Sequence, residues 1–444
     1  MKKINRRNFI KGSGMLTMAS LGGLQLGFAK RLTKGGQTGS DLLVYVFLNG
    51  GMDGLHMVPP RSGSDYSQYK DVLRPSLHIP NDTDAGLDDT PSIQLNGTSA
   101  FGMHPAAAEL AQLFNDDKMC IVHATGLVES NRSHFEATRY LELGVAGASG
   151  ASSGWLTRYF ESSVNTPGDA IMPSLVPSYS TTDAVLADSA TLIMADPENF
   201  GLEYGHWSWE AEMQQALTEI NSQATTPERL SAQKTLNASA IIQNIDWDSY
   251  SPGNGAVYPS SFIGDQLKTV AQLYKSDVDL EVAYVPTGGW DTHNNQENVF
   301  NDLTTDLSQA LYAFYQDLAA THSGQFTVVV QSEFGRRAYQ NSDNSTDHGY
   351  GNPMFIISDN VVPGFHGIFP GLAQNQLYEG DDVAVTVDYR DVVSEIILKR
   401  MGNPFLGHIF PGYNDYTELG VITGQNTTPI YSFDSIFKSG FESS

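Results

Sequence analysis

The feature that most constrains the fold of this chain is a set of continuous apolar runs that end in Gly or polar residues. The first run, LLVYVFL at 42–48, is followed by Asn49 and then by Gly50 and Gly51. A strand with one face in water would alternate apolar and polar residues, so an unbroken run predicts a strand buried on both faces. Similar strands are predicted at 118–125, 280–289, 325–332 and 353–358.

Segments with helical spacing lie between these runs. Ser133, Glu136 and Gly144 give one of them a capping box and a stop, and Asp388 and Gly402 bound another. The predicted helices span 104–114, 133–144, 297–322 and 387–402. Alternating buried strands and helices predict an α/β fold, with a mostly parallel central sheet sandwiched by helices. Residues 145–260 are less regular and are expected to form an insertion over this sheet, with short strands at 183–187 and 191–195.

The charge of the chain is divided unevenly. The 444 residues carry a net charge of −25, yet residues 1–34 hold eight basic side chains and no acidic one. The rest is therefore strongly acidic, which disfavours binding to nucleic acid or anionic lipid. Cys120 is the single cysteine, so an intrachain disulfide is excluded.

The basic N-terminus resembles a bacterial twin-arginine export signal. Arg6 and Arg7 precede Phe9 and a weakly apolar stretch rich in Gly, Met and Leu. We therefore expect residues 1–34 to be a signal peptide and linker, with the twin-arginine translocase as partner during export. The mature chain is expected to be periplasmic or extracellular, without an integral membrane segment, and residues 416–444 to form a C-terminal tail.

Polar residues that carry chemistry follow the predicted strands. Ligands of parallel α/β sheets bind outside the carboxyl ends of the strands, so these residues are expected to share one site. Asp, Glu and His bind Zn²⁺, Mn²⁺ or Mg²⁺, and a Ser at a helix N-terminus is placed to act as a nucleophile. Arg suits the oxygens of phosphate or sulfate. The predicted metal ligands are Asp53, Asp291, His293, Glu333 and His348, and the predicted catalytic residues are Ser133, Arg336 and Arg337.

Each of these residues also has a structural interpretation. Asp53 fits a turn, Ser133 fits the capping box, and Asp291 with His293 fits a loop cap. Glu333 is placed to form an ion pair with one of the two arginines that follow it, and Asp347-His348-Gly349 fits a turn. Their coincidence at successive strand ends favours a shared site.

Several blocks of the chain, over about residues 41–415, resemble the twin-arginine-exported bacterial family called domain of unknown function 1501. They contain the motifs GGMDG, NRSHFEA, GGWDTH, SEFGRR and TDHG. The family looks like a distant member of the alkaline phosphatase/sulfatase superfamily. The resemblance implies an alkaline-phosphatase-like fold with one or two divalent ions. Asp291, His293 and His348 would hold one ion, and Asp53, Ser133 and Glu333 the other.

The sequence departs from the superfamily pattern at Phe334, where a ligand His is expected. Two functions follow from the resemblance. The first is an exported metal-dependent hydrolase of phosphate or sulfate esters, with Ser133 as nucleophile and a small anionic ester as substrate. The alternative is a catalytically degenerate, export-associated binding or assembly protein that acts on an unknown protein partner.

Overall fold

A computed structural model describes residues 41–432 except 88, 149, 164, 167–169, 171, 189, 199, 201–209 and 223–225. The predicted export signal and residues 433–444 of the predicted tail lie outside the described residues.

Within the described part of the chain, nine strands form one sheet around the first apolar run. The spatial order is β10-β4-β9-β8-β1-β7-β5-β6, and β11 also pairs with β4. The strands are β1 (Leu42–Leu48), β4 (Met119–Gly126), β5 (Ser174–Val176), β6 (Thr191–Ile193), β7 (Val282–Thr287), β8 (Phe326–Ser332), β9 (Asn352–Ile357), β10 (Gly364–His366) and β11 (Val387–Asp388). Only β9 runs antiparallel to its neighbours in this sheet. The predicted α/β class with a mostly parallel sheet is confirmed.

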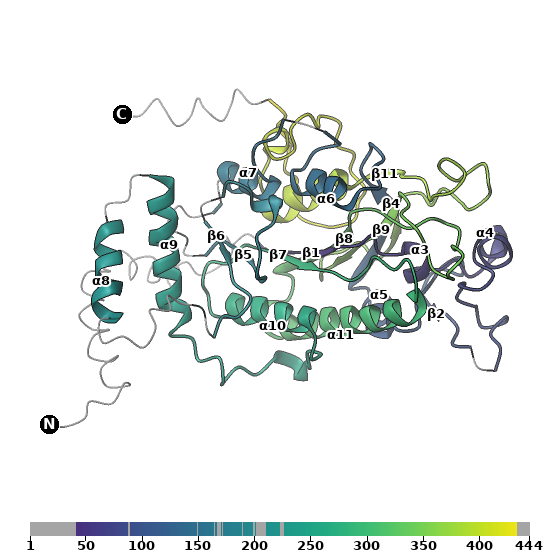
Figure 1. Cartoon of the computed structure of the whole chain (residues 1–444), viewed down its shortest axis with the longest axis horizontal. Helices are drawn as coiled ribbons and strands as arrows, with labels where there is room; N and C mark the ends of the chain where they lie inside the picture. Colours follow the sequence, from purple (N-terminus) through teal and green to yellow (C-terminus); the bar gives the residue numbers. More distant parts are fainter. Residues whose placement is uncertain are drawn as a thin grey trace. The chain divides into compact units, whose positions relative to one another are not determined.

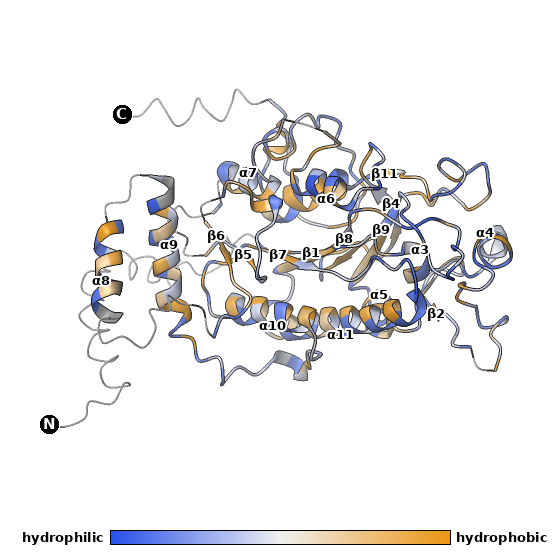
Figure 2. Ribbon diagram, viewed as in Figure 1, coloured by the Kyte–Doolittle hydropathy of each residue, from blue (hydrophilic) through white to orange (hydrophobic). Residues whose placement is uncertain are grey.

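The sheet has a helical layer on each face, and β1 contributes to both cores. Its residues at 42, 44, 46 and 48 join one apolar cluster, and those at 43, 45 and 47 join the other. Strand side chains alternate between faces, so the unbroken run supplies both clusters. The first cluster includes α5 (Ala108–Asn115), α10 (Phe262–Lys275) and α11 (Gln296–His322), and the second includes α6 (His134–Glu142), α7 (Trp155–Ser162), α12 (Tyr389–Ile396) and α13 (Leu406–Ile409). Figure 1 shows the two layers, and Figure 2 shows the apolar strands between them.

The predicted helices form close to their expected bounds. Asp388 caps α12 by accepting a hydrogen bond from the Arg390 N–H, and the helix continues as a π-helical turn over Ile397–Met401. Gly402 ends it at a φ of 65°, a conformation that favours glycine. The N-cap and the C-terminal end of this helix therefore follow from the local sequence.

Residues 145–260 do more than cover the sheet, because β5 and β6 extend its edge. The strand predicted at 183–187 is wrong, since Asp183–Val185 is a 3₁₀ turn. The Thr182 hydroxyl accepts a hydrogen bond from the Ala184 N–H, and the Glu142 carboxylate accepts one from the Asp183 N–H. These local bonds satisfy the backbone in place of a ladder. Helices α8 (Glu210–Asn221) and α9 (Pro227–Ile242) complete the segment.

The chain between β1 and β4 contains short elements only. These are α3 (Gly54–Met57), α4 (Gly63–Gln68), a π-helical turn over Tyr69–Leu73, and the antiparallel pair β2 (Ile93–Gln94) and β3 (Gly102–Met103). Among the described residues, no helix combines the length and apolar character that crossing a bilayer requires.

Candidate metal centre

The loops that follow β1, β4, β7 and β8 meet at one edge of the sheet. All four strands point the same way, because β4 and β8 are both antiparallel to β9, and β8, β1 and β7 are mutually parallel. Their carboxyl ends therefore deliver His134, Asp291, His293 and His348 to one place.

One carboxylate oxygen and three imidazole nitrogens converge there. Asp291 Oδ1 lies 3.3 Å from His134 Nε2, 2.9 Å from His293 Nε2 and 3.2 Å from His348 Nε2. His348 Nε2 also lies 2.9 Å from the Nε2 atoms of both other histidines. We call these four residues the histidine cluster. His134, Asp291 and His348 have the mutual spacing of metal ligands.

The hydrogen-bond partner of each Nδ1 atom determines the tautomer of its ring. His134 Nδ1 lies 2.6 Å from Glu333 Oε1, and His293 Nδ1 lies 2.9 Å from Asp347 Oδ1. His348 Nδ1 lies 2.9 Å from the carbonyl oxygen of Arg132. Carboxylates and carbonyls only accept, so each Nδ1 carries a proton, and each ring presents an Nε2 lone pair when it is neutral.

This donor set fits a divalent metal ion. Lone pairs of three nitrogens and a carboxylate oxygen repel one another at these distances unless a cation lies between them. Imidazole and carboxylate are zinc ligands, and ligating histidines almost always donate their other N–H to a carboxylate or carbonyl. The chain meets both conditions with its own residues, so His134, Asp291 and His348 would hold the ion, and His293 lies beside them.

Two glycines allow the first loop to approach this edge. Gly50 has a φ of 124°, and a Cβ there would lie 2.4 Å from the Asp291 backbone nitrogen. Gly51 has a φ of 66°, and a Cβ there would lie 2.6 Å from the Phe334 ring. Larger residues would be strained and would push the loops apart.

Glu333 supports the histidine cluster without pairing with an arginine. Its carboxylate accepts hydrogen bonds from the Gly50 N–H at 2.8 Å, from the Ser332 hydroxyl at 3.0 Å and from His134. The expected ion pair between Glu333 and an arginine is therefore wrong. Phe334, at the position where a ligand His was expected, packs against the rings of His134 and His348, with centroids 4.9 and 5.1 Å away.

Arg336 is not placed to bind a substrate anion. The Arg336 side chain has 0% exposure, and its guanidinium bonds to Asp291 Oδ1 at 2.5 Å. Its other donors are taken by four backbone carbonyls, those of Gly50, Gly51, Trp290 and Thr346. Arg337 instead approaches Asp381, at 3.4 Å. The structure thus corrects the catalytic role expected for Arg336, since burial removes it from substrate.

Asp53 lies outside the histidine cluster, in a buried ion pair. Arg74 donates to its two oxygens at 2.8 and 3.0 Å, and Gln296 Nε2 donates to Oδ2 at 2.6 Å. The Asp53 side chain is 1% exposed and that of Arg74 is 0% exposed. The expected role of Asp53 as a metal ligand is therefore not supported, because a buried guanidinium already neutralises this carboxylate.

Ser133 is the N-cap residue of α6, but its hydroxyl makes no capping hydrogen bond. Its backbone N–H donates instead to Asn131 Oδ1 at 2.8 Å. Glu136 accepts from Asn131 Nδ2 at 3.1 Å, so the predicted capping box does not form. Ser133 lies between Arg132, whose carbonyl orients His348, and the cluster residue His134.

The charges around the cluster shift the pKa values of its members. Burial alone would raise the pKa of Asp291, but the hydrogen bond and charge of Arg336, aided by His134 and His293, lower it to about 2. The hydrogen bond to Glu333 raises the pKa of His134, while burial lowers the pKa of His348. Asp291 is therefore ionised at every physiological pH, as a ligand must be.

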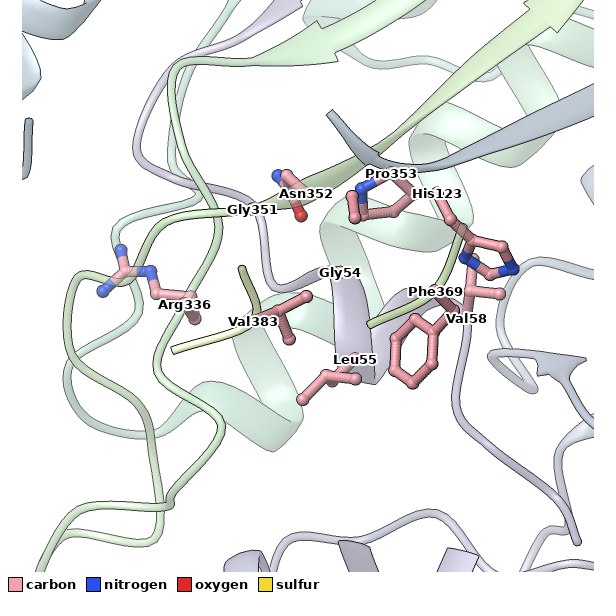
Figure 3. Close-up of a pocket in the computed structure, with 11 residues that line it drawn as sticks. Gly54, Leu55, Val58, His123, Arg336, Gly351, Asn352, Pro353, Phe369 and Val383 are labelled. Carbon is pink, nitrogen blue, oxygen red and sulfur yellow. The ribbon is translucent and has the colours of Figure 1, made fainter. Parts of the chain in front are cut away.

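A cavity of about 20 Å³ adjoins the loop after β1, and Figure 3 shows the residues around it. Leu55, Val58 and Phe369 give it apolar walls. Asn352 lines it as well, and its buried Oδ1 has no hydrogen-bond partner. The volume suits a single water molecule, so this cavity is not a substrate pocket.

Comparison with known families gives a match over residues 202–401, to the model described as protein of unknown function (DUF1501). This part of the chain is similar to that family. The DUF1501 match confirms the family predicted from the motifs, and it includes Asp291, His293 and His348. Ser133 and His134 precede the matched residues. A comparison with curated proteins found no match.

Solved structures give distant similarities. The C-terminal periplasmic domain of EcEptC from Escherichia coli, in complex with Zn, shares 8% identity, with 72% of this chain and 74% of that chain covered and a TM-score of 0.32. The alkaline phosphatase of the Antarctic bacterium TAB5 shares 11% (74% and 95% covered, TM-score 0.28). The sulfatase PsFucS1 from Pseudoalteromonas sp. shares 9% (87% and 74% covered, TM-score 0.33). Similarity this low assigns no activity, so the chemistry is argued from the residues themselves.

Sequence reasoning missed His134 as a member of the site. The residue lies in the NRSHFEA motif, directly after Ser133, but the motif was interpreted at its serine. The signal that could have identified His134 is its place at the start of a predicted helix that follows a buried strand. The same argument identified its neighbour Ser133.

Proposed function

We propose that this chain is an exported, metal-dependent hydrolase of phosphate or sulfate esters. The observation that carries the proposal is the convergence of three imidazole Nε2 atoms on the oxygen of Asp291. The side chains of these four residues are 25–46% exposed, whereas those of Glu333 and Arg336 beside them are almost fully buried. Exposed ligands with buried supports leave the site open to a substrate from solvent.

A divalent ion at this site would polarise a phosphate or sulfate ester and stabilise negative charge on an attacking oxygen. Ser133 supplies the candidate nucleophile, because it is partly exposed and its hydroxyl makes no capping bond. It also lies at the N-terminus of α6, where the helix dipole favours a negatively charged oxygen. Attack by the Ser133 oxygen on phosphorus or sulfur would break the bond to the alcohol oxygen and release the alcohol, which takes up the serine proton. Water would then hydrolyse the phosphate or sulfate ester of Ser133.

The alternative is a binding or assembly protein that holds a metal ion without turnover. One observation favours it: Arg336, one of the two arginines expected to bind the substrate anion, is buried and bonded to Asp291. Both functions share the metal centre, so activity separates them.

Export by the twin-arginine route remains part of the proposal. It is supported by Arg6 and Arg7 ahead of a weakly apolar stretch in the sequence. A chain without disulfides that folds around a metal ion before export suits a pathway that transports folded proteins.

Activity on aryl phosphates and aryl sulfates tests the proposal. Protein loaded with Zn²⁺, Mn²⁺ or Mg²⁺ should hydrolyse at least one of these esters, and Ser133→Ala should abolish turnover. Ser133→Ala removes no capping bond, so the variant should fold and bind metal like the parent. His134→Ala should lose both metal and turnover. A metal-loaded parent that is inactive on the whole panel would favour the binding protein.

A further inference from the structure

We propose that the centre binds a single divalent ion, and that the buried guanidinium of Arg336 supplies the positive charge that a second ion would otherwise bring. The inference rests on the proposed metal centre and defines its composition. It departs from the two-ion arrangement implied by the resemblance, in which Asp53, Ser133 and Glu333 would hold another ion.

The two carboxylates of that second set already have partners. Both oxygens of Asp53 bind Arg74, and Gln296 and the His56 N–H donate to them as well. Glu333 Oε1 accepts from the Gly50 N–H and from His134, and Oε2 accepts from Ser332. A metal ion at either carboxylate would displace donors that are themselves buried, and those donors would lose their hydrogen bonds.

The charges of the centre balance at one ion. Asp291, Asp347 and Glu333 supply three negative charges at the cluster, and Arg336 supplies one positive charge. The histidines are neutral when each carries its proton on Nδ1 alone, and Asp53 and Arg74 cancel each other. The net charge of the centre is therefore −2, and one divalent ion neutralises it. A second would leave an excess of +2 in a partly buried site, which is costly.

The position of Arg336 reinforces this count. Its Nη2 lies 2.5 Å from the same Asp291 oxygen that faces the histidines, and its Nη1 lies 3.5 Å from His293 Nε2. Four backbone carbonyls and full burial keep the guanidinium in place. A fixed cation thus borders the cluster on this side and repels any further cation there.

Metal stoichiometry of the full chain tests the inference. Protein equilibrated with excess Zn²⁺ and then desalted should contain one zinc per chain by plasma emission. Co²⁺ titration should reach its end point at one equivalent, with the visible absorption of a four-coordinate site. Two ions per chain, or none, would overturn the inference.

Variants locate the ion. Glu333→Gln retains an acceptor for His134, so it should keep one zinc with roughly 10–100-fold weaker affinity. Asp53→Asn should leave both stoichiometry and affinity unchanged. A loss of one of two ions in either variant would contradict a single-ion centre. One zinc without ester turnover would refute the hydrolase and keep this inference, whereas two zincs with turnover would do the reverse.

Discussion

Replacing Asp53 by Ala should reduce stability strongly and leave metal binding intact. The Asp53 and Arg74 side chains are 1% and 0% exposed, and two hydrogen bonds at 2.8 and 3.0 Å join them. Removing one partner of a buried pair leaves the other charge uncompensated, which costs about 3–5 kcal/mol. The lost bond from Gln296 adds roughly 1 kcal/mol.

The matched control is Asp84→Ala, which removes the partner of Lys70. The Lys70 and Asp84 side chains are 29% and 36% exposed, so solvent screens this pair and its loss should cost much less than the loss of Asp53. A second control replaces both partners of the buried pair, as Asp53→Leu with Arg74→Met, and should recover much of the lost stability, because no charge is left unpaired.

Urea unfolding followed by circular dichroism measures these differences, both with a chelator and with saturating Zn²⁺. The loss in Asp53→Ala should be the same under both conditions, because Asp53 does not contribute to the metal centre. A loss of unfolding free energy that appears only with metal present would refute this reasoning and would indicate that Asp53 is a metal ligand. A cost no larger than that of Asp84→Ala would also refute it.

Three further predictions concern other parts of the chain. In metal-free protein, Glu333→Ala should lower the melting temperature, because it removes the buried acceptor of His134; an unchanged melting temperature would contradict this. Burial lowers the pKa of His123 to about 4, so the unfolded chain binds the proton first and stability is lost as the pH falls from 6.5 to 4. His123→Phe should reduce this loss by up to about 3 kcal/mol. Urea unfolding at both pH values measures the loss, and an equal loss in parent and variant would count against the prediction. Replacing Arg6 and Arg7 by Lys should prevent export, as cell fractionation would show, and normal periplasmic delivery would refute the signal.

The position of the site could be predicted from the sequence. Buried runs followed by Gly or charged residues identified the strand ends, and parallel strands place their carboxyl ends at one edge. Asp291, His293 and His348 were expected together and do lie together. Whether they bind metal stays a prediction.

The partners of each charge could not be predicted in the same way. Glu333 and Arg336 are three residues apart, yet one bonds His134 and the other bonds Asp291. Sequence proximity suggested that the two would pair with each other. Pairing instead follows from which loops the sheet order brings together, and several arrangements satisfy the same local sequence.

The sequence by itself determined the fold class, because seven consecutive apolar residues in β1 can be buried only between two layers. It also predicted the sheet edge at which Asp291, His293 and His348 gather. The tertiary structure alone decided that His134 belongs to the histidine cluster. It also decided that Asp53 lies outside the cluster and pairs with Arg74, and that Arg336 is buried beside Asp291. The physical reason is that hydrogen bonds and ion pairs join residues far apart in the sequence: Asp53 and Arg74 are separated by 21 positions, Asp291 and Arg336 by 45, and His134 and His348 by 214. Local patterns report periodicity over one or two turns, so they carry no information on such pairs.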